Sequence, residues 1–389
     1  MKIWFLTRSL YPYQKTGGGQ IRLGQVNYLK ELGWNIEIIM PNYENDKINH
    51  IDNIVQVPYT KTQKLASLFE RIGIYEDYLD KWIDDTFKYI KDKIKKEDIV
   101  FSTSGGELGM IKLGSLLKDK IGCKFVVNFH DPLAYSLVHG LKLNSKFHIS
   151  REKQEKKYLK NSDMIITSSK SNQDSLINKH PEFKDKIECN YFGYIKKLDI
   201  STDKDKKSAK LKIAYVGNMS YTQRPEVLYR AYERLENKLD VEIYFIGNSK
   251  NYKPLSTIDD TNVKFIDLMP HDEFLKFMVE NIDIGFVSLS NDYLGACVPS
   301  KIYEYINLSL PMIGALPDGD GIEIINQNNY GIACRYDDIK SITNAIIKFR
   351  DKEYLQEIKN NVVSDKDRWS MQTKIKEVDR LLRELINES

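Results

Sequence analysis

Cysteine is scarce in this sequence, and its spacing excludes two common structural devices. The chain has 389 residues and four cysteines. The cysteines lie far apart and form no CxxC pair, so neither a disulfide framework nor a zinc site is expected. They fit a reducing cytoplasm and burial as small apolar residues, and they are Cys123, Cys189, Cys297 and Cys334.

Long apolar runs are also missing. The N-terminal stretch MKIWFLTRSLYP has four consecutive apolar residues, too few for the core of a signal peptide. Other apolar runs, such as CKFVVNF and IDIGFVSLS, are far below the length that spans a bilayer. We therefore expect a cytoplasmic protein that is soluble, or at most peripheral at the inner face of the cell membrane.

Charge of one sign is not in excess. The chain has 58 Lys plus Arg and 55 Asp plus Glu, so composition gives no reason to expect nucleic acid as a partner. Local lysine-rich segments occur at residues 88–96, 151–160 and 204–212. Each has an ordinary interpretation as a solvated helix face or a linker. A basic face on an N-terminal domain would also suit a membrane that carries anionic lipid.

The chain is longer than one hydrophobic core usually serves, which predicts two domains. Short runs rich in Ile, Val and Phe alternate with longer stretches of helical periodicity, which is typical of parallel sheets covered by helices. The strands expected in the first half are 2–8, 35–41, 53–58, 98–104, 124–130 and 164–169. Those expected in the second half are 211–217, 241–247, 263–267, 282–289, 310–316 and 331–336.

The expected fold class is α/β, with two doubly wound Rossmann-like domains whose carboxyl strand ends face across a cleft. The domains are 1–195 and 211–368, joined by a linker rich in Lys and Asp at 196–210. Helices are expected at 24–33, 225–235 and 271–281. The stretch 61–97 is a charged helical region, interpreted as an insertion on the first domain or as a membrane-facing element. The amphipathic tail 369–389 packs on the second domain or crosses back to the first.

The most informative stretch is VPSKIYEYINLSLPMIGALPDGDGIEII, residues 298–325. Ser300 is a good N-cap residue, and a helix that starts there would point backbone N–H groups at a phosphate, with Lys301 adding positive charge. Glu304, one turn further, is either a carboxylate for the hydroxyls of a ribose or a solvent-facing residue. The glycines of the following loop, Gly319 and Gly321, which flank Asp320, would let backbone amides approach a charged ligand. No neighbouring carboxylate or histidine supports a metal at Asp318 and Asp320, so no metal site is predicted.

Three other segments place glycine or polar residues at the carboxyl ends of predicted strands. The segment TGGGQIR contains Gly18, Gly19 and Arg22 but does not match GxGxxG, so a flexible glycine loop that faces a phosphate fits better than a dinucleotide site. His130 ends a strand and is either structural or functional. The turn after residue 217 holds Asn218, Gln223 and Arg224, and Arg224 is either a diphosphate ligand or a solvated residue.

Taken together, these segments resemble the retaining glycosyltransferases of family 4, which have the two-domain GT-B fold. The resemblance covers nearly the whole chain, and its most specific part, PSKIYEY followed by a short strand and a Gly-rich loop, resembles the branch that builds bacterial surface polysaccharides. It implies that Glu304 binds the nucleotide ribose and that Gly18 and Gly19 close on the diphosphate and sugar. It also implies that His130 approaches the transferred sugar, that the 319–321 loop offers amides to that sugar, and that the tail returns to the first domain.

The sequence departs from the family in two places. The family's first glutamate, eight positions before Glu304, is replaced by Ala296. The Arg and Lys that bind phosphate in the second domain's first turn appear here as Asn218 and Gln223, which leaves Arg224 and Lys301 as substitutes. Both departures concern the donor, and the first also concerns catalysis.

The function that the resemblance implies is retaining, metal-independent transfer of a sugar from a nucleotide-sugar, UDP- or GDP-linked, to a glycan or lipid-linked acceptor in surface polysaccharide or glycoconjugate synthesis. The nucleotide-sugar is a substrate, and no cofactor is expected. Two alternatives stay open: a nucleotide-sugar epimerase or hydrolase on the same fold, and a non-catalytic paralogue that binds a sugar nucleotide or a partner enzyme. They differ in whether donor is consumed and whether an acceptor is needed.

Overall fold

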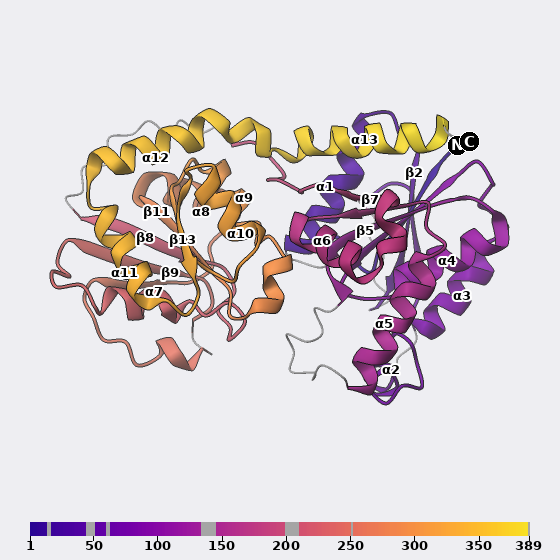
Figure 1. Ribbon diagram of the computed structural model, residues 1–389, viewed down its shortest axis with the longest axis horizontal. Coiled ribbons are helices and arrows are strands. Elements are labelled where there is room, and N and C mark those ends of the chain that lie inside the picture. Colours follow the sequence, from indigo (N-terminus) through magenta and orange to yellow (C-terminus); the bar gives the residue numbers. More distant parts are fainter. Residues whose placement is uncertain are drawn as a thin grey trace. The chain divides into compact units, whose positions relative to one another are not determined.

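The chain folds into two compact units in the computed structural model, which describes residues 1–13, 17–43, 51–59, 63–133, 145–198, 210–249 and 252–387. The first unit comprises Met1–Ile195 together with Met371–Ser389, and the second comprises Lys196–Ser370. Each unit is built on one parallel sheet with helices on its faces (Figure 1).

The first unit contains a seven-stranded sheet in the order β3-β2-β1-β4-β5-β6-β7. Its strands are β1 (Ile3–Leu6), β2 (Ile36–Asn42), β3 (Ile54–Pro58), β4 (Ile99–Gly105), β5 (Lys124–Asp131), β6 (Met164–Thr167) and β7 (Ile187–Cys189). Its helices are α1 (Gly17–Glu31), α2 (Gln63–Arg71), α3 (Asp80–Ile90), α4 (Gly109–Ile121), α5 (Lys146–Leu159), α6 (Lys170–Lys179), the 3-10 helix η2 (Pro181–Lys186) and α13 (Met371–Asn387).

Side chains that alternate along β1 supply two separate apolar clusters. Ile3 and Phe5 belong to the cluster that also contains residues of α1 and α13, and Trp4 and Leu6 belong to the cluster that contains residues of α3 and α4. Successive residues of a strand point to opposite faces, so each cluster covers one face of the sheet.

The tail helix α13 lies beside α1 in this unit (Figure 1). Its apolar stripe is buried in the same cluster as Ile3 and consists of Ile375, Val378, Leu381, Leu382 and Leu385. A Cβ at Gly24 would lie 2.7 Å from Sδ of Met371, so the glycine lets the two helices approach closely. Trp34 also donates from Nε1 to Asp379, at 2.7 Å.

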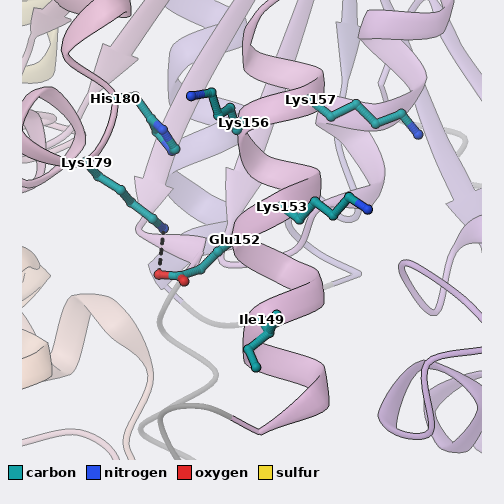
Figure 2. Close-up of a pocket in the computed structure, with 7 residues that line it drawn as sticks. All are labelled: Ile149, Glu152, Lys153, Lys156, Lys157, Lys179 and His180. Atoms are coloured by element: carbon teal, nitrogen blue, oxygen red, sulfur yellow. Dashed lines mark ion pairs between the residues drawn. The ribbon is translucent and has the colours of Figure 1, made fainter.

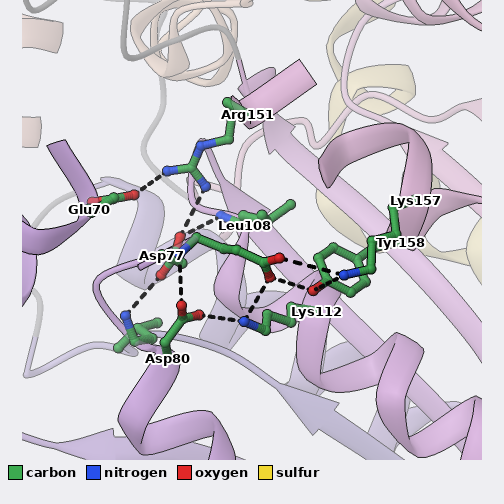
Figure 3. A network of polar contacts seen from close by, with 10 residues as sticks. Glu70, Asp77, Asp80, Leu108, Lys112, Arg151, Lys157 and Tyr158 are labelled. Carbon is green, nitrogen blue, oxygen red and sulfur yellow. Dashed lines mark hydrogen bonds and ion pairs between the residues drawn. The ribbon is translucent and has the colours of Figure 1, made fainter. Parts of the chain in front are cut away.

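The charged region expected at 61–97 forms α2 and α3, which pack on this unit. Trp82 and Ile83 of α3 enter the cluster around Trp4. Figure 3 shows the polar network that fixes the segment between the two helices: fully buried Asp77 accepts from Nη1 of Arg151, at 3.0 Å, and from the amide of Leu108, at 2.9 Å. Arg151 also pairs with Glu70. A buried carboxylate whose charge and hydrogen bonds are satisfied in this way fixes the positions of α2, α4 and α5 relative to one another.

The second unit contains a six-stranded parallel sheet in the order β10-β9-β8-β11-β12-β13. Its strands are β8 (Leu211–Val216), β9 (Val241–Ile246), β10 (Val263–Ile266), β11 (Ile284–Ser288), β12 (Met312–Leu316) and β13 (Gly331–Arg335). Its helices are α7 (Glu226–Tyr232), α8 (His271–Asn281), α9 (Ser300–Asn307), α10 (Asp320–Gln327), α11 (Ile339–Lys348) and α12 (Lys352–Asp365), with 3-10 helices η3 (Lys253–Leu255), η4 (Asp292–Ala296) and η5 (Lys366–Trp369).

The twelve predicted strands are all present, with ends that differ by at most two residues. The helix predicted at 271–281 has the bounds of α8. The strand β7 was not predicted, because its three residues, which pair with Ile165–Thr167 of β6, are too few to show a period. Residues 199–209 of the predicted linker lie outside the described residues.

Candidate functional site

Each sheet has one place where the order of its strands reverses. In the first unit this place lies between β1 and β4, and in the second between β8 and β11. Parallel α/β sheets bind ligands at the carboxyl ends of the strands next to such a reversal. Most of the site residues predicted from the sequence lie near the carboxyl strand ends at these two places.

His130, near the end of β5, is buried with 7% of its surface exposed. Its Nε2 lies 3.1 Å from Oε1 of Gln25 in α1, and its ring packs on Phe192 with 4.5 Å between centroids. Burial, together with the positive charges of Arg22 and Arg8, lowers the pKa of His130 well below its ordinary value. The imidazole is therefore neutral at pH 7.

Gln25 is a site residue that the sequence analysis missed. Its Nε2 donates to Oδ1 of Asn128, at 3.0 Å, and its Oε1 faces His130, so it joins two residues of β5. The only sequence signal was a polar residue at an inward position of a helix, between apolar Ile21 and Leu29. That signal alone does not distinguish a functional residue from a satisfied core residue.

Arg22 of α1 is buried with 1% of its surface exposed, and its guanidinium lies beside Gly105, the last residue of β4. A Cβ at Gly105 would lie 2.7 Å from Nη2 of Arg22, so the glycine makes room for the guanidinium. Burial lowers the pKa of Arg22, and the carboxylate of Glu107 opposes that shift. Glu107 accepts from the amide of Gly105, at 2.9 Å, and pairs with Arg8, at 3.4 Å. Arg8 and Glu107 were not predicted.

The glycines of TGGGQIR do not form a loop, which corrects the prediction. Gly18 and Gly19 lie in the first turn of α1, which begins at Gly17. Gly19 already accepts a backbone hydrogen bond from Tyr11, at 3.2 Å. The first amides of a helix lack intrahelical acceptors. Because glycine has no side chain, these amides are little covered in the first turn of α1, and the glycines do not act as a hinge.

In the second unit, Lys301 reaches from α9 to the carboxyl end of β8. Its Nζ lies 2.9 Å from Oε1 of Gln223, 3.1 Å from the hydroxyl of Tyr215 and 4.6 Å from the centroid of that ring. A Cβ at Gly217 would lie 3.2 Å from Cε of Lys301, so the side chain packs against this glycine. Burial lowers the pKa of Lys301 to about 8, although Glu304 opposes the shift.

Glu304 is partly buried one turn further along α9. Burial raises its pKa, and the positive charges of His271 and Lys301 oppose the rise. His271 is the first residue of α8. It is exposed, and its charge acts on Glu304, so it belongs to the surroundings of this carboxylate.

Ser300 is not the N-cap of α9, which corrects a second prediction. Pro299 occupies the cap position, because its carbonyl accepts the first helical hydrogen bond, from Ile302, at 3.0 Å, and no side chain caps the helix. Ser300 is the first helical residue and is exposed. Its hydroxyl therefore makes no capping hydrogen bond. The residue still lies at the N-terminus of α9.

The DGDG segment is the start of α10 rather than an open loop. Gly319 is the cap residue with φ 141°, and Asp320 and Gly321 form the first turn. A Cβ at Gly319 would lie 2.2 Å from the carbonyl oxygen of Gly295 in η4, which explains glycine at this position by a close backbone approach.

Gly321 lies where the first turns of α9 and α10 approach each other. A Cβ at Gly321 would lie 3.6 Å from Ile302 and 3.7 Å from Pro299, so the first turns of α9 and α10 are neighbours. Asp320 is buried with 1% of its surface exposed. Ala296, the residue in place of the family's glutamate, ends η4.

The three site residues predicted in the turn between β8 and α7 have different surroundings. Gln223 faces Lys301, as described above. Asn218 is exposed, and its backbone carbonyl accepts from the hydroxyl of Tyr215. Arg224 has φ +47° and donates from Nε to Glu226, at 3.1 Å. The guanidinium is therefore partly neutralised by its own helix, and Lys301 is the better-placed cation of the two.

A depression of about 570 Å³ lies on the first unit, on the surface of α5 (Figure 2). Its lining contains neither His130 nor Arg22 and consists of Ile149, Glu152, Lys153, Lys156, Lys157, Lys179 and His180. Lys156 and Lys157 are 61% and 58% exposed, so their ion pairs with Glu182 and Glu76 are screened by water.

Neither a metal cluster nor a membrane-spanning helix is found in the part of the chain that the structure describes. There, no group of three or more His, Cys, Asp or Glu side chains could hold a metal ion. No helix of the described ranges is both long and apolar enough to cross a membrane.

The architecture is the GT-B fold, with two doubly wound Rossmann-like α/β units, as predicted. Solved structures align over nearly the whole chain. The lipopolysaccharide outer core galactosyltransferase WaaB, in its apo form, has a TM-score of 0.71 and 12% identity, over 99% of both chains.

Two further structures align equally widely. Sucrose-phosphate synthase from Thermosynechococcus elongatus has a TM-score of 0.70 and 13% identity, over all of both chains. Anabaena Alr3699/HepE, in complex with UDP and glucose, has a TM-score of 0.67 and 13% identity, over 99% of this chain and 100% of that chain. No protein-family model matches the chain, and no curated protein matches its sequence.

Proposed function

We propose that this protein is a retaining glycosyltransferase of family 4 that moves a sugar from a nucleotide-sugar to a glycan or lipid-linked acceptor in bacterial surface polysaccharide or glycoconjugate synthesis. The observation that carries the proposal is the position of Lys301, a half-buried cation held by Gln223 at the carboxyl end of β8. A cation that is desolvated beside glycine backbone and helix N-termini is suited to a diphosphate.

The second unit supplies the groups that a nucleotide diphosphate needs. Lys301 and the first-turn amides of α9 and α10 neutralise the phosphates, and the Glu304 carboxylate accepts hydrogen bonds from the ribose hydroxyls. WaaB is a galactosyltransferase and the HepE structure is a complex with UDP and glucose, which supports a UDP-linked donor here, with GDP as the other candidate.

The first unit supplies groups for the transferred sugar. His130 contacts the sugar from its buried position, while Arg22 and the glycine turn of α1 add positive charge and amides. In the reaction, the bond from the anomeric carbon to the diphosphate breaks, and the acceptor oxygen forms a bond on the same face. The departing diphosphate takes the acceptor's proton, so neither a protein nucleophile nor a metal is required.

A thermal-shift panel of UDP, GDP, dTDP, CMP and ADP forms tests the donor site, because a ligand of the native state raises the unfolding temperature. One nucleotide family is expected to stabilise the wild type, and Glu304→Ala is expected to lose that shift. Glu357→Ala, an exposed residue of α12, is the matched control. An equal shift in wild type and Glu304→Ala would remove Glu304 from the site.

Turnover of the stabilising donor separates the alternatives. A transferase needs an acceptor for full rate, whereas an epimerase or hydrolase consumes donor alone. The replacement of the family's glutamate by Ala296 favours one further alternative, a paralogue that binds donor without turning it over. Donor binding with no turnover under any acceptor would replace the proposed activity by that one.

We also propose that the enzyme works at the cytoplasmic face of a membrane, through the basic surface of α5. Lys153 and Lys157 point to one side of this helix and Lys156 to the other (Figure 2). Exposed apolar residues lie on the same helix, on α2, which packs against it, and directly after α2, and they are Ile149, Leu65, Leu68 and Ile72. Lysines next to apolar side chains fit an anionic bilayer, at about 1 kcal/mol per lysine.

Flotation with vesicles tests this surface. Vesicles that contain phosphatidylglycerol are expected to retain the protein at low salt, and pure phosphatidylcholine vesicles are not. A triple Lys→Gln variant at 153, 156 and 157 is expected to lose binding. Lys352→Gln, on the second unit, is the control. Equal flotation of the triple variant would exclude this surface.

A further inference from the structure

The side chain of Gln25 connects Asn128 and His130 in a buried line of hydrogen bonds. Gln25 is 2% exposed and Asn128 is 1% exposed. Nε2 of Gln25 lies 3.0 Å from Oδ1 of Asn128, and Oε1 of Gln25 lies 3.1 Å from Nε2 of His130. Buried from solvent, these groups depend on one another for hydrogen-bond partners.

The backbone fixes the direction of this line. Nδ2 of Asn128 lies 3.4 Å from the carbonyl oxygen of Ile166 in β6. A carbonyl oxygen only accepts hydrogen bonds, so Asn128 presents its NH2 group there and its oxygen to Gln25. Gln25 must then donate to Asn128 and present its own oxygen to His130. The ring of His130 therefore carries its proton on Nε2.

The other ring nitrogen is an acceptor without a protein partner. Among the described residues, Nδ1 of His130 has no hydrogen-bond partner, although the ring is buried. The ring is neutral, so Nδ1 offers a lone pair and no proton. Its backbone is fixed as well, because Ser168 donates from its hydroxyl to the carbonyl of His130, at 2.8 Å.

We propose that Gln25 is a positioning residue that holds His130 as the Nε2–H tautomer, so that Nδ1 accepts a hydrogen bond from a hydroxyl group of the bound sugar. The identity of the ligand rests on the proposed function, whereas the tautomer does not. A donor whose sugar lacks that hydroxyl leaves a buried acceptor unpaired. The enzyme therefore discriminates against the corresponding deoxy-sugar.

Nitrogen NMR of the full chain, labelled with 15N in the histidine rings, tests the tautomer without any ligand. His130→Asn assigns the resonances. His180 is an internal reference, because its Nε2 lies 2.8 Å from Oε1 of Glu155, which only accepts when ionised. We expect His130 to be neutral with its proton on Nε2 at pH 7. A proton on Nδ1, or a ring that is charged at pH 7, would overturn the proposal.

Two substitutions of Gln25 test its role. Gln25→Leu removes the acceptor, so the single tautomer signature is expected to disappear. Gln25→Glu places a negative charge at Nε2, so protonation of the ring is expected at higher pH than in the wild type. Asn27→Leu, at an exposed position of the same helix, is the control and is expected to change neither the tautomer of His130 nor the pH at which its ring is protonated. An unaltered His130 spectrum in folded Gln25→Leu would exclude the role of Gln25.

Kinetics with the donor identified by the thermal-shift panel give the second readout. Gln25→Leu is expected to lower kcat about tenfold, the effect of one misdirected hydrogen bond, while nucleotide affinity stays unchanged. If the chain turns over no donor yet shows the Nε2–H tautomer, the proposed function fails and the assignment of Gln25 stands. An unchanged kcat in Gln25→Leu with an altered tautomer would remove His130 from contact with the sugar.

Discussion

Lys301 gives the most quantitative prediction, because burial already disfavours its charged form in the free protein. Burial lowers its pKa from an ordinary 10.5 to about 8. That difference corresponds to about 3 kcal/mol of free energy against the charged form. A bound diphosphate brings negative charge to the ammonium and restores its pKa, so binding above pH 8 must be accompanied by uptake of a proton.

The expected magnitude follows from one linked proton. The Kd of UDP or GDP should be constant below about pH 7 and should rise about tenfold per pH unit above about pH 8. Lys301→Arg stays charged throughout this range, so its Kd should be flat. Lys301→Met lacks the charge at every pH, so its Kd should be flat and about tenfold to a hundredfold weaker at pH 7.

Isothermal titration calorimetry between pH 7 and pH 9 measures the Kd of the nucleotide at each pH. Buffers with different ionisation enthalpies report the proton uptake on binding directly. Lys352→Met, an exposed position at the start of α12, is the control and should follow the wild type. A constant Kd for the wild type, or the same slope in Lys301→Arg, would show that Lys301 does not meet the diphosphate.

Three further predictions concern stability, each checked by urea unfolding of the full chain. Arg151→Met leaves buried Asp77 without its cation and should cost about 3 to 5 kcal/mol, and a loss below about 1 kcal/mol would contradict the proposed role of the network. Gly319→Ala should cost about 2 kcal/mol or more, since φ is 141° and the new Cβ meets Gly295 at 2.2 Å; a neutral result would mean that this backbone approach relaxes freely. The unfolded state binds more protons than the native state between the two pKa values of Lys301, so unfolding free energy should rise from about pH 8 to about pH 10.5, and Lys301→Met should lack this rise.

The fold was predictable from the sequence because its signal is repetitive. Apolar runs such as 35–41 and 124–130 are buried on both faces of a parallel sheet, so they are continuous and recognisable without any knowledge of partners. The edge strand β7 lacks that property, and it was missed. The starts of α9 and α10 were located but described wrongly, because a proline cap and a glycine close approach resemble a serine cap and a ligand loop in sequence.

The candidate site was less predictable, because its decisive contacts join segments far apart in the chain. The sequence places Lys301 one turn from Glu304, but not against Gln223, which lies 78 residues away. It shows Gln25 as a polar residue in a helix, but not its bond to Asn128, 103 residues away.

In the family pattern that this chain resembles, a basic residue occupies the place of Gln223. Here Gln223 is neutral, and its side-chain oxygen instead anchors the ammonium of Lys301 from α9. Gln223→Lys would therefore place a second ammonium group beside the partly buried Lys301 and repel it. We expect that change, although it restores the family residue, to weaken nucleotide binding unless Lys301 is replaced by Met at the same time. A tighter Kd in the single variant, measured by the same calorimetry, would show that the two cations act side by side on the diphosphate.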